Sequence, residues 1–349
     1  MKMKRVILAA LVMVLAFALM PMNAEAAAKT KLSHSAISLP AGGKWQLSLE
    51  NAPAGKKVTW SSNNKKVATV SKKGKVTAKK IGTAKVTAKV KGKKYTCTVN
   101  VIKPNASDVK ALKKIIKAQK KRGAKVSSKM NSSSYTWNGN GRLTGISWNN
   151  CKLKGSISFA GLKELTIVNC ASNKLSKLDV SKNTKLEQLD CTANQLSKLD
   201  VSKNKKLVLL SCVSNQLSKL DVRKNTKLLY LYCGGNQLSQ LDVSKNKKLV
   251  NLFCDTNQLS SLNVSNNTKL EYINCSSNQL STLDVSKNTK LVFLSCTSNQ
   301  LSQLDVSKNT KLLYLYCNDN KITTLDLSNN TALIDVGRDD TVEVIGYNK

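Results

Sequence analysis

The sequence predicts a β-rich protein in which a small β-sandwich precedes a solenoid with a parallel sheet on its concave face. In the second half of the chain, a cysteine returns every 21 residues. A fixed period of that length is typical of one supersecondary unit stacked on copies of itself. In the first half, short runs of alternating apolar residues are separated by glycine and asparagine turns, which is typical of a small all-β module.

Residues 1–26 have the features of a secretory signal peptide. Lys2, Lys4 and Arg5 precede an uncharged apolar run, and Ala24-Glu25-Ala26 offers small residues for cleavage. The sequence contains no second apolar run of membrane-spanning length, no hydrophobic C-terminal tail and no sorting motif. We therefore expect a secreted or cell-surface protein that is held non-covalently and does not span the membrane.

The chain is strongly basic, with 57 Lys and Arg against 20 Asp and Glu and a formal net charge of +37. Residues 29–102 contain 17 lysines and one acid, Glu50. Such a charge favours anionic partners, among them cell-wall polymers and acidic glycans, and it equally fits a secreted protein kept soluble by its lysines. No groove-reading motif accompanies the charge, so we do not expect a nucleic acid partner.

Residues 29–102 resemble a known domain family. The segment VTWSSNNKKVATVSKKGKVTAKKIGTAKVTAKV, which begins at Val58, is similar to the bacterial immunoglobulin-like (group 2) domain. The resemblance implies a β-sandwich with Trp60 in its core and with Gly74 and Gly82 at turns. Cys97 alternates with the valines of the last strand, so we expect a buried apolar thiol there.

Residues 103–141 are predicted to form a helical cap and a linker. Apolar residues fall at helical spacing from Ser107-Asp108 to Arg122-Gly123, and lysines occupy the outer face. A basic amphipathic helix can bind a membrane surface or a partner. A helix placed directly before a solenoid fits better as a cover for the open end of its core.

Residues 142–349 are predicted to form the solenoid, with a degenerate cap at its C-terminal end where Arg338 replaces the cysteine. One coil reads Leu186-x-x-Leu189-x-Cys191-x-x-Asn194-x-Leu196-x-x-Leu199-x-Val201, and these apolar residues are expected to fill the core. The cysteines form one column: Cys170, Cys191, Cys212, Cys233, Cys254, Cys275, Cys296 and Cys317. The asparagines form a second: Asn173, Asn194, Asn215, Asn236, Asn257, Asn278, Asn299 and Asn320.

Both columns are interpreted as structural ladders. Cysteines on adjacent parallel strands lie about 4.8 Å apart, farther than the roughly 3.8 Å between Cβ atoms that a disulfide prefers. We therefore expect buried thiols that act as small hydrophobic residues. The asparagine amides are expected to satisfy inward-facing backbone groups, so that Asn257 contributes more to stability than Asn267, which we place in the outer turn.

No constellation for catalysis, metal or cofactor is apparent in the sequence. His34 is the one histidine, and the cysteines lack the paired spacing of a zinc site. Seven of the 20 acids form a row beside lysines, the opposite of the apolar setting that raises the pKa of a catalytic acid. This row is Asp179, Asp200, Asp221, Asp242, Asp284, Asp305 and Asp326. We therefore expect no enzyme, no metal and no cofactor.

The residues one and three positions before each cysteine are expected to face solvent on the concave sheet, because side chains alternate along a strand. Seven of the chain's Tyr and Phe residues occupy these positions, an arrangement typical of a binding surface. The alternative is that aromatic residues simply suit strands. The candidate ligand-binding residues are Tyr230, Tyr232, Asn251, Phe253, Tyr272, Asn274, Phe293, Tyr314 and Tyr316.

The repeat LxxLxCxxNxLxxLDVSxN, regular from Leu165 to Ile322, resembles the internalin-like secreted leucine-rich-repeat proteins with 21-residue coils and a cysteine ladder. The resemblance implies a concave face that binds a host protein or glycan in adhesion. The chain differs from that family in placing its immunoglobulin-like domain before the repeats and in lacking a wall-sorting tail. We expect an exported bacterial adhesion protein; the alternative is a wall-associated structural protein held on anionic polymers by its lysine-rich surfaces.

Overall fold

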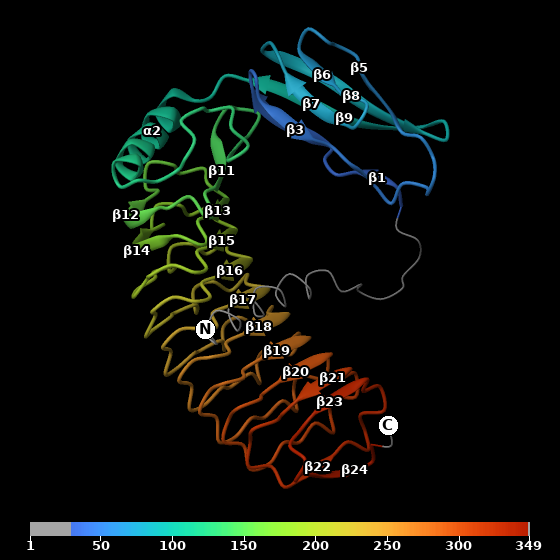
Figure 1. The fold of residues 1–349 in the computed structure, drawn as a ribbon, viewed down its shortest axis with the longest axis vertical. Helices are drawn as coiled ribbons and strands as arrows, with labels where there is room; N and C mark the ends of the chain where they lie inside the picture. The colour runs from blue at the N-terminus through green and yellow to red at the C-terminus, as the bar shows by residue number, and fades with distance from the viewer. Residues whose placement is uncertain (1–28, 348–349) are drawn as a thin grey trace.

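The computed structural model describes residues 29–347, and Figure 1 shows a β-sandwich, one helix and a curved solenoid in chain order. The predicted fold class is confirmed. The proposed signal peptide, residues 1–26, lies outside the described residues. Among the described residues, no helix is both long and apolar enough to cross a membrane.

The N-terminal module is a sandwich of two sheets flanked by a short strand pair. The four-stranded sheet has the order β2 (Ala36–Pro40), β9 (Lys93–Ile102), β8 (Gly82–Val90) and β5 (Thr59–Ser62). The three-stranded sheet has the order β3 (Lys44–Gln46), β7 (Lys75–Ala78) and β6 (Ala68–Val70). The flanking pair is β1 (Lys31–Leu32) and β4 (Leu49–Glu50).

The core of the sandwich contains Cys97 as a fully buried thiol. Burial raises the pKa of the Cys97 thiol to about 11. Trp60 is half-buried and packs against this core from its edge rather than inside it. Gly74 has a φ of +81°, and a Cβ there would lie 2.8 Å from Cζ2 of Trp60, so the turn requires glycine for two reasons.

Helix α2 (Ala106–Lys121) covers the first coil of the solenoid. It begins one residue earlier than the sequence predicts, because Oδ1 of Asn105 accepts hydrogen bonds from the backbone N–H groups of Ser107 and Asp108. Leu112 and Ile116 are buried in the same apolar cluster as the solenoid leucines. The helix therefore closes the open end of the core with its apolar face.

The stretch between the helix and the first repeat contains a strand that sequence analysis did not predict. Strand β10 (Tyr135–Trp137) pairs antiparallel with β11 (Leu143–Ser147), and both of its aromatic residues are buried. Nε1 of Trp137 donates to the carbonyl of Met130 at 2.9 Å. The polar composition of this stretch concealed the strand, which covers the N-terminal edge of the long sheet.

The solenoid contributes one three-residue strand per coil to a parallel sheet that lines the inner side of its curve (Figure 1). Each strand residue pairs with the residue one repeat later, as Leu189 pairs with Leu210. After β11 the strands are β13 (Ile167–Asn169), β15 (Gln188–Asp190), β16 (Leu209–Ser211), β17 (Tyr230–Tyr232), β18 (Asn251–Phe253), β19 (Tyr272–Asn274), β20 (Phe293–Ser295), β21 (Tyr314–Tyr316) and β23 (Asp335–Gly337).

Two short parallel pairs lie on the flank away from this sheet. Strands β12 (Lys154–Ser158) and β14 (Lys174–Asp179) pair at the N-terminal end, and β22 (Thr324–Asp326) and β24 (Glu343–Ile345) pair at the C-terminal end. At that end Asp339 closes the open backbone ladder. Its carboxylate accepts hydrogen bonds from the backbone N–H groups of Asp319 and Asn320.

The cysteine column runs through the centre of the solenoid core. All eight ladder cysteines are buried and form no disulfide. Burial raises the pKa of each ladder thiol, to about 12 for Cys212 and Cys275. In the first coil Trp148 takes the cysteine position and is also fully buried. The prediction of buried cysteines in 21-residue coils is confirmed.

Candidate functional site on the concave sheet

The strands of the concave sheet alternate between core and surface. In β17 the middle residue, Leu231, is fully buried, whereas Tyr230 and Tyr232 on either side are half-exposed. The same pattern recurs in β19 and β21. The positions one and three before each cysteine therefore point away from the core, as alternation along a strand requires.

Three tyrosines occupy the same position in three coils. Tyr230, Tyr272 and Tyr314 each lie three residues before a cysteine, and each is partly exposed. Asn251 and Phe293 lie between them in the register of the sheet, so the five residues form one row across adjacent strands. We call its three tyrosines, Tyr230, Tyr272 and Tyr314, the tyrosine row.

The two phenylalanines of the candidate site are buried, which corrects the expectation that they face solvent. Phe253 and Phe293 each expose 5% of their surface. The ring of Tyr232 packs edge-on against Phe253 with centroids 5.4 Å apart, and Tyr316 packs against Phe293 at 5.8 Å. Aromatic pairs of this kind stabilise one another, so the phenylalanines support the tyrosines instead of meeting a ligand directly.

Two polar contacts further restrict the tyrosines next to the cysteines. Oη of Tyr316 donates to Oδ2 of Asp335 at 2.8 Å, and burial together with this carboxylate raises the pKa of Tyr316 to about 12. Nδ2 of Asn251 donates to Oη of Tyr232 at 3.5 Å, and Asn251 is itself buried. Asn274, the last of the predicted residues, is half-exposed beside them.

Asp255 is a residue of this surface that sequence analysis missed. A Cβ added at Gly234 would lie 2.6 Å from Oδ1 of Asp255, so the carboxylate occupies the space that a side chain at position 234 would fill. Burial raises the pKa of Asp255. The signal in the sequence was the Gly234-Gly235 pair, at positions where the other complete coils carry side chains.

The concave positions contain no lysine or arginine in the described coils. This holds for the residues three before, one before and one after the cysteine position from β13 to β23. Four carboxylates occupy such positions: Asp190, Asp255, Asp335 and Asp339. In a chain with a net charge of +37, this face therefore presents aromatic rings, amides and a few acids.

The predicted asparagine ladder joins adjacent coils. Nδ2 of Asn194 donates to the carbonyl of Cys170 in the preceding coil and to those of Cys191 and Thr192 in its own, at 3.0–3.2 Å. Oδ1 of Asn194 accepts the backbone N–H of Leu175 at 2.9 Å. Equivalent donor bonds recur at every asparagine of the ladder.

A second asparagine ladder was not predicted. Asn267, which we placed in the outer turn without a ladder role, is fully buried. Its Nδ2 donates to the carbonyls of Val243 and Asn246, both at 3.0 Å. The same contacts recur in this column: Asn183, Asn204, Asn225, Asn246, Asn267, Asn288, Asn309 and Asn330.

The aspartate row has a local structural role. The carboxylate of each aspartate accepts the backbone N–H of the residue two positions later, as Asp200 accepts that of Ser202 at 2.8 Å. These hydrogen bonds lower the pKa of the aspartates, and the guanidinium of Arg223 helps to lower that of Asp221 to about 2. Asn263 makes the same turn contact with Ser265. These side chains stabilise turns.

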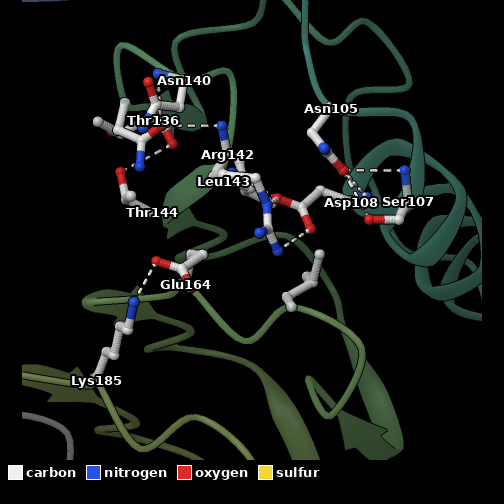
Figure 2. A network of polar contacts seen from close by, with 12 residues as sticks. Asn105, Ser107, Asp108, Thr136, Asn140, Arg142, Leu143, Thr144, Glu164 and Lys185 are labelled. Carbon is white, nitrogen blue, oxygen red and sulfur yellow. Dashed lines mark hydrogen bonds and ion pairs between the residues drawn. The ribbon is translucent and has the colours of Figure 1, made fainter.

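Figure 2 shows the polar network that fixes α2 to the first coil. Asp108 exposes 1% of its surface and receives two hydrogen bonds from Arg142, Nε to Oδ2 at 2.8 Å and Nη2 to Oδ1 at 3.0 Å. The backbone N–H of Leu143 donates to the same carboxylate at 2.9 Å. The network joins the helix to β11. Among the described residues, no cluster of three or more His, Cys, Asp or Glu is placed to hold a metal.

The N-terminal module belongs to a known domain family. Residues 26–99 match the family model of the bacterial Ig-like domain (group 2). Residues 26–99 thus match the bacterial Ig-like domain (group 2), and a solenoid of 21-residue leucine-rich repeats with buried cysteines follows them. No curated protein matches the sequence.

Several solved leucine-rich-repeat structures are similar to the solenoid. The functional domain of InlJ from Listeria monocytogenes, described as including a cysteine ladder, is 33% identical over 56% of this chain and 53% of its own, with a TM-score of 0.46. The internalin InlF from Listeria monocytogenes is 20% identical over 54% and 69%, with a TM-score of 0.40. A TDR receptor is 21% identical over 55% and 38%, with a TM-score of 0.51. The chain spans about half the length of the InlJ structure it matches.

Proposed function

We propose that this chain is an exported bacterial adhesion protein whose concave face binds an extracellular protein or glycan. The observation that carries the proposal is the tyrosine row on a face without lysine or arginine, in a chain that is otherwise rich in lysine. Half-exposed tyrosines offer a large apolar area together with a hydroxyl group, at a small cost in side-chain entropy. The signal-peptide features of the sequence support export to the secreted or cell-surface compartment.

The packing of the face supports recognition rather than catalysis. Phe253 and Phe293 hold Tyr232 and Tyr316 in fixed orientations, so the ring faces are ordered before a ligand arrives. Asn274 and Asp255 provide polar groups beside the rings. The aspartate row is engaged in turns and its pKa values are lowered, which is the opposite of what a general acid requires. We accordingly propose a non-enzymatic role.

The test removes the tyrosine row without disturbing the sheet. Tyr230, Tyr272 and Tyr314 are replaced together by Gln, a residue that Gln188 already places at the same position in another coil. Full-length wild-type and variant proteins are compared on arrays of extracellular glycoproteins and glycans. We expect the variant to lose at least about tenfold in affinity for the wild-type ligand, since buried aromatic anchors carry most of the binding energy of an interface.

The same three coils provide the matched control. Lys227, Lys269 and Lys311 are exposed, and each lies three residues before one of the tyrosines. Their joint replacement by Gln should leave array binding within about twofold, because rim charges contribute little to affinity. Unchanged binding after loss of the tyrosines would contradict a concave site.

The alternative function, a wall-associated structural protein held by lysine-rich surfaces in general, has weaker support. Residues 250–347 contain seven Lys and Arg against ten Asp and Glu, so the C-terminal coils are not basic. A protein retained through all its repeats would need cationic charge along the whole solenoid.

A further inference from the structure

The charge of the molecule changes sign from one end to the other. Residues 29–141 hold 27 Lys and Arg against two acids, and residues 142–249 hold 19 against seven. Residues 250–347 hold seven against ten. The +37 of the chain is therefore concentrated on the sandwich, on α2 and on the first coils, and the fold of the repeats does not require this concentration.

One position of the repeat shows the change most clearly. Seven residues after the cysteine, the first three regular coils carry Lys177, Lys198 and Lys219. All three are exposed. The following coils carry neutral residues at this position, Gln240, Ser261, Thr282, Gln303 and Thr324. The three lysines recur once per coil along the flank, Lys177 in β14 and Lys198 and Lys219 at the equivalent position of the next two coils.

Helix α2 lies at the N-terminal end of this line of lysines. Nη1 of Arg122 donates to the carbonyls of Lys154 and Ser156 in β12, at 3.2 and 2.7 Å, and so holds the end of the helix against that strand. Strand β12 in turn pairs with β14, where Lys154 faces Lys174 and Ser156 faces Lys177. Figure 1 shows α2, β12 and β14 on the side of the coils away from the concave sheet.

Helix α2, which packs against β12 beside this line, carries six exposed lysines. They are Lys110, Lys113, Lys114, Lys117, Lys120 and Lys121. A shallow groove between α2 and β12 is lined by Lys114, Ser156 and Ser158, among others. We call the α2 lysines together with Lys154, Lys174, Lys177, Lys198 and Lys219 the basic flank.

We propose that the basic flank binds a linear phosphate-bearing polymer that runs from α2 along the first coils. A line of lysines one coil apart matches an extended chain better than a flat membrane surface. Lysine binds phosphate as a point charge, without the fixed bidentate geometry of arginine, so a row of lysines suits the successive charges of an extended polymer. The two exposed arginines of this region are already engaged, Arg122 with backbone carbonyls and Arg223 with Asp221.

The acids of the same coils offset only part of this charge. Asp179, Asp200 and Asp221 each follow a lysine of the line by two residues, and each accepts a backbone N–H in its own turn. Residues 142–249 still hold 19 cations against seven acids. Because the basic flank and the concave sheet lie on opposite sides of the coils, one can hold a polymer while the other remains available to its own ligand.

The test uses inorganic polyphosphate as the probe and the full chain as the protein. Affinity is measured against NaCl concentration for the wild type and for Lys177, Lys198 and Lys219 replaced together by Gln, which Gln240 and Gln303 already place at this position. We expect the variant to bind at least about tenfold more weakly, and the slope of log K against log salt to fall by roughly one per lysine removed.

A charge-matched variant separates a defined site from general charge. Lys287, Lys290 and Lys308 are exposed lysines of the C-terminal coils, and their replacement by Gln removes the same charge. This variant should bind polyphosphate within about twofold of wild type. Equal losses in the two variants, or no polyphosphate binding by the wild type, would overturn the proposal. Preference of the wild type for anionic lipid vesicles over polyphosphate would also overturn it, in favour of a membrane surface.

Discussion

Within each coil of the solenoid, the inward positions repeat almost unchanged, whereas the outward positions of the concave sheet differ from coil to coil. Asparagine occupies the ladder position in eight consecutive coils. Three residues before the cysteine, the same coils carry Ile167, Gln188, Leu209, Tyr230, Asn251, Tyr272, Phe293 and Tyr314. The repeated side chains make the hydrogen bonds and apolar contacts that join one coil to the next. The varied side chains are not constrained by the stack in this way, so they can suit a ligand.

Of the changes predicted here, alkaline pH should lower the stability of the solenoid core most, because it favours ionisation of the buried thiols. An unfolded thiol titrates near its ordinary pKa of 9.0, while Cys212 and Cys275 titrate near 12 in the folded chain. The folded state thus retains protons that the unfolded state loses, and this stability is complete below pH 9 and is lost as pH rises toward 12. We expect the free energy of unfolding to fall by about 1.4 kcal/mol per pH unit for each buried thiol.

Denaturant titrations at pH 8 and at pH 10.5 measure this fall directly. Replacing Cys212, Cys233 and Cys254 by Ala lowers the starting stability because it leaves cavities. It should also reduce the slope of the unfolding free energy against pH by the contribution of the three thiols removed. The same pH slope in the variant and the wild type would mean that the ladder is not the titrating group.

Alanine substitutions at Asn257 and Asn267 compare the two asparagine ladders, with smaller expected losses of unfolding free energy than alkaline pH. Asn257→Ala removes three donor contacts and the acceptor for the backbone N–H of Leu238, and Asn267→Ala removes two donor contacts. Unpaired buried groups are costly, so we expect losses of about 3 kcal/mol or more for Asn257→Ala and about 2 kcal/mol for Asn267→Ala. The exposed neighbour Asn266 is the control, and Asn266→Ala should change the unfolding free energy by less than about 0.5 kcal/mol. Equal effects at Asn266 and Asn267 would contradict the second ladder.

Substitutions in the turn after each strand should have the smallest effect on stability, and they can be made in both directions, to glycine and from glycine. Ala193 and Gly235 occupy equivalent positions with φ of +53° and +64°. Ala193→Gly should stabilise the chain by up to about 1 kcal/mol, because glycine adopts this conformation without strain, and Gly235→Ala should destabilise it by about 1 kcal/mol. Thermal melts of the two variants check the signs, and shifts in the same direction would rule out backbone strain as the cause.

The repeat period predicted most of the fold, since a 21-residue step defines both the stack and the inward phase of every coil. It could not predict which outward side chains cover one another. Phe253 and Phe293 follow the outward phase but are buried by tyrosines of adjacent strands, a contact between coils that alternation within one strand does not contain. The burial of Asn267 was missed for a similar reason, because its partners Val243 and Asn246 belong to the preceding coil.

The most direct test of the division between folding and recognition is hydroxyl-radical footprinting of the full chain with and without the ligand that the arrays identify. Protection of Tyr230, Tyr272 and Tyr314, with no change at Tyr95 in the sandwich, is the predicted result. Each of these four tyrosines is partly exposed and open to the reagent in the unliganded chain. Protection confined to residues outside the concave sheet, with the tyrosine row unchanged, would contradict the account.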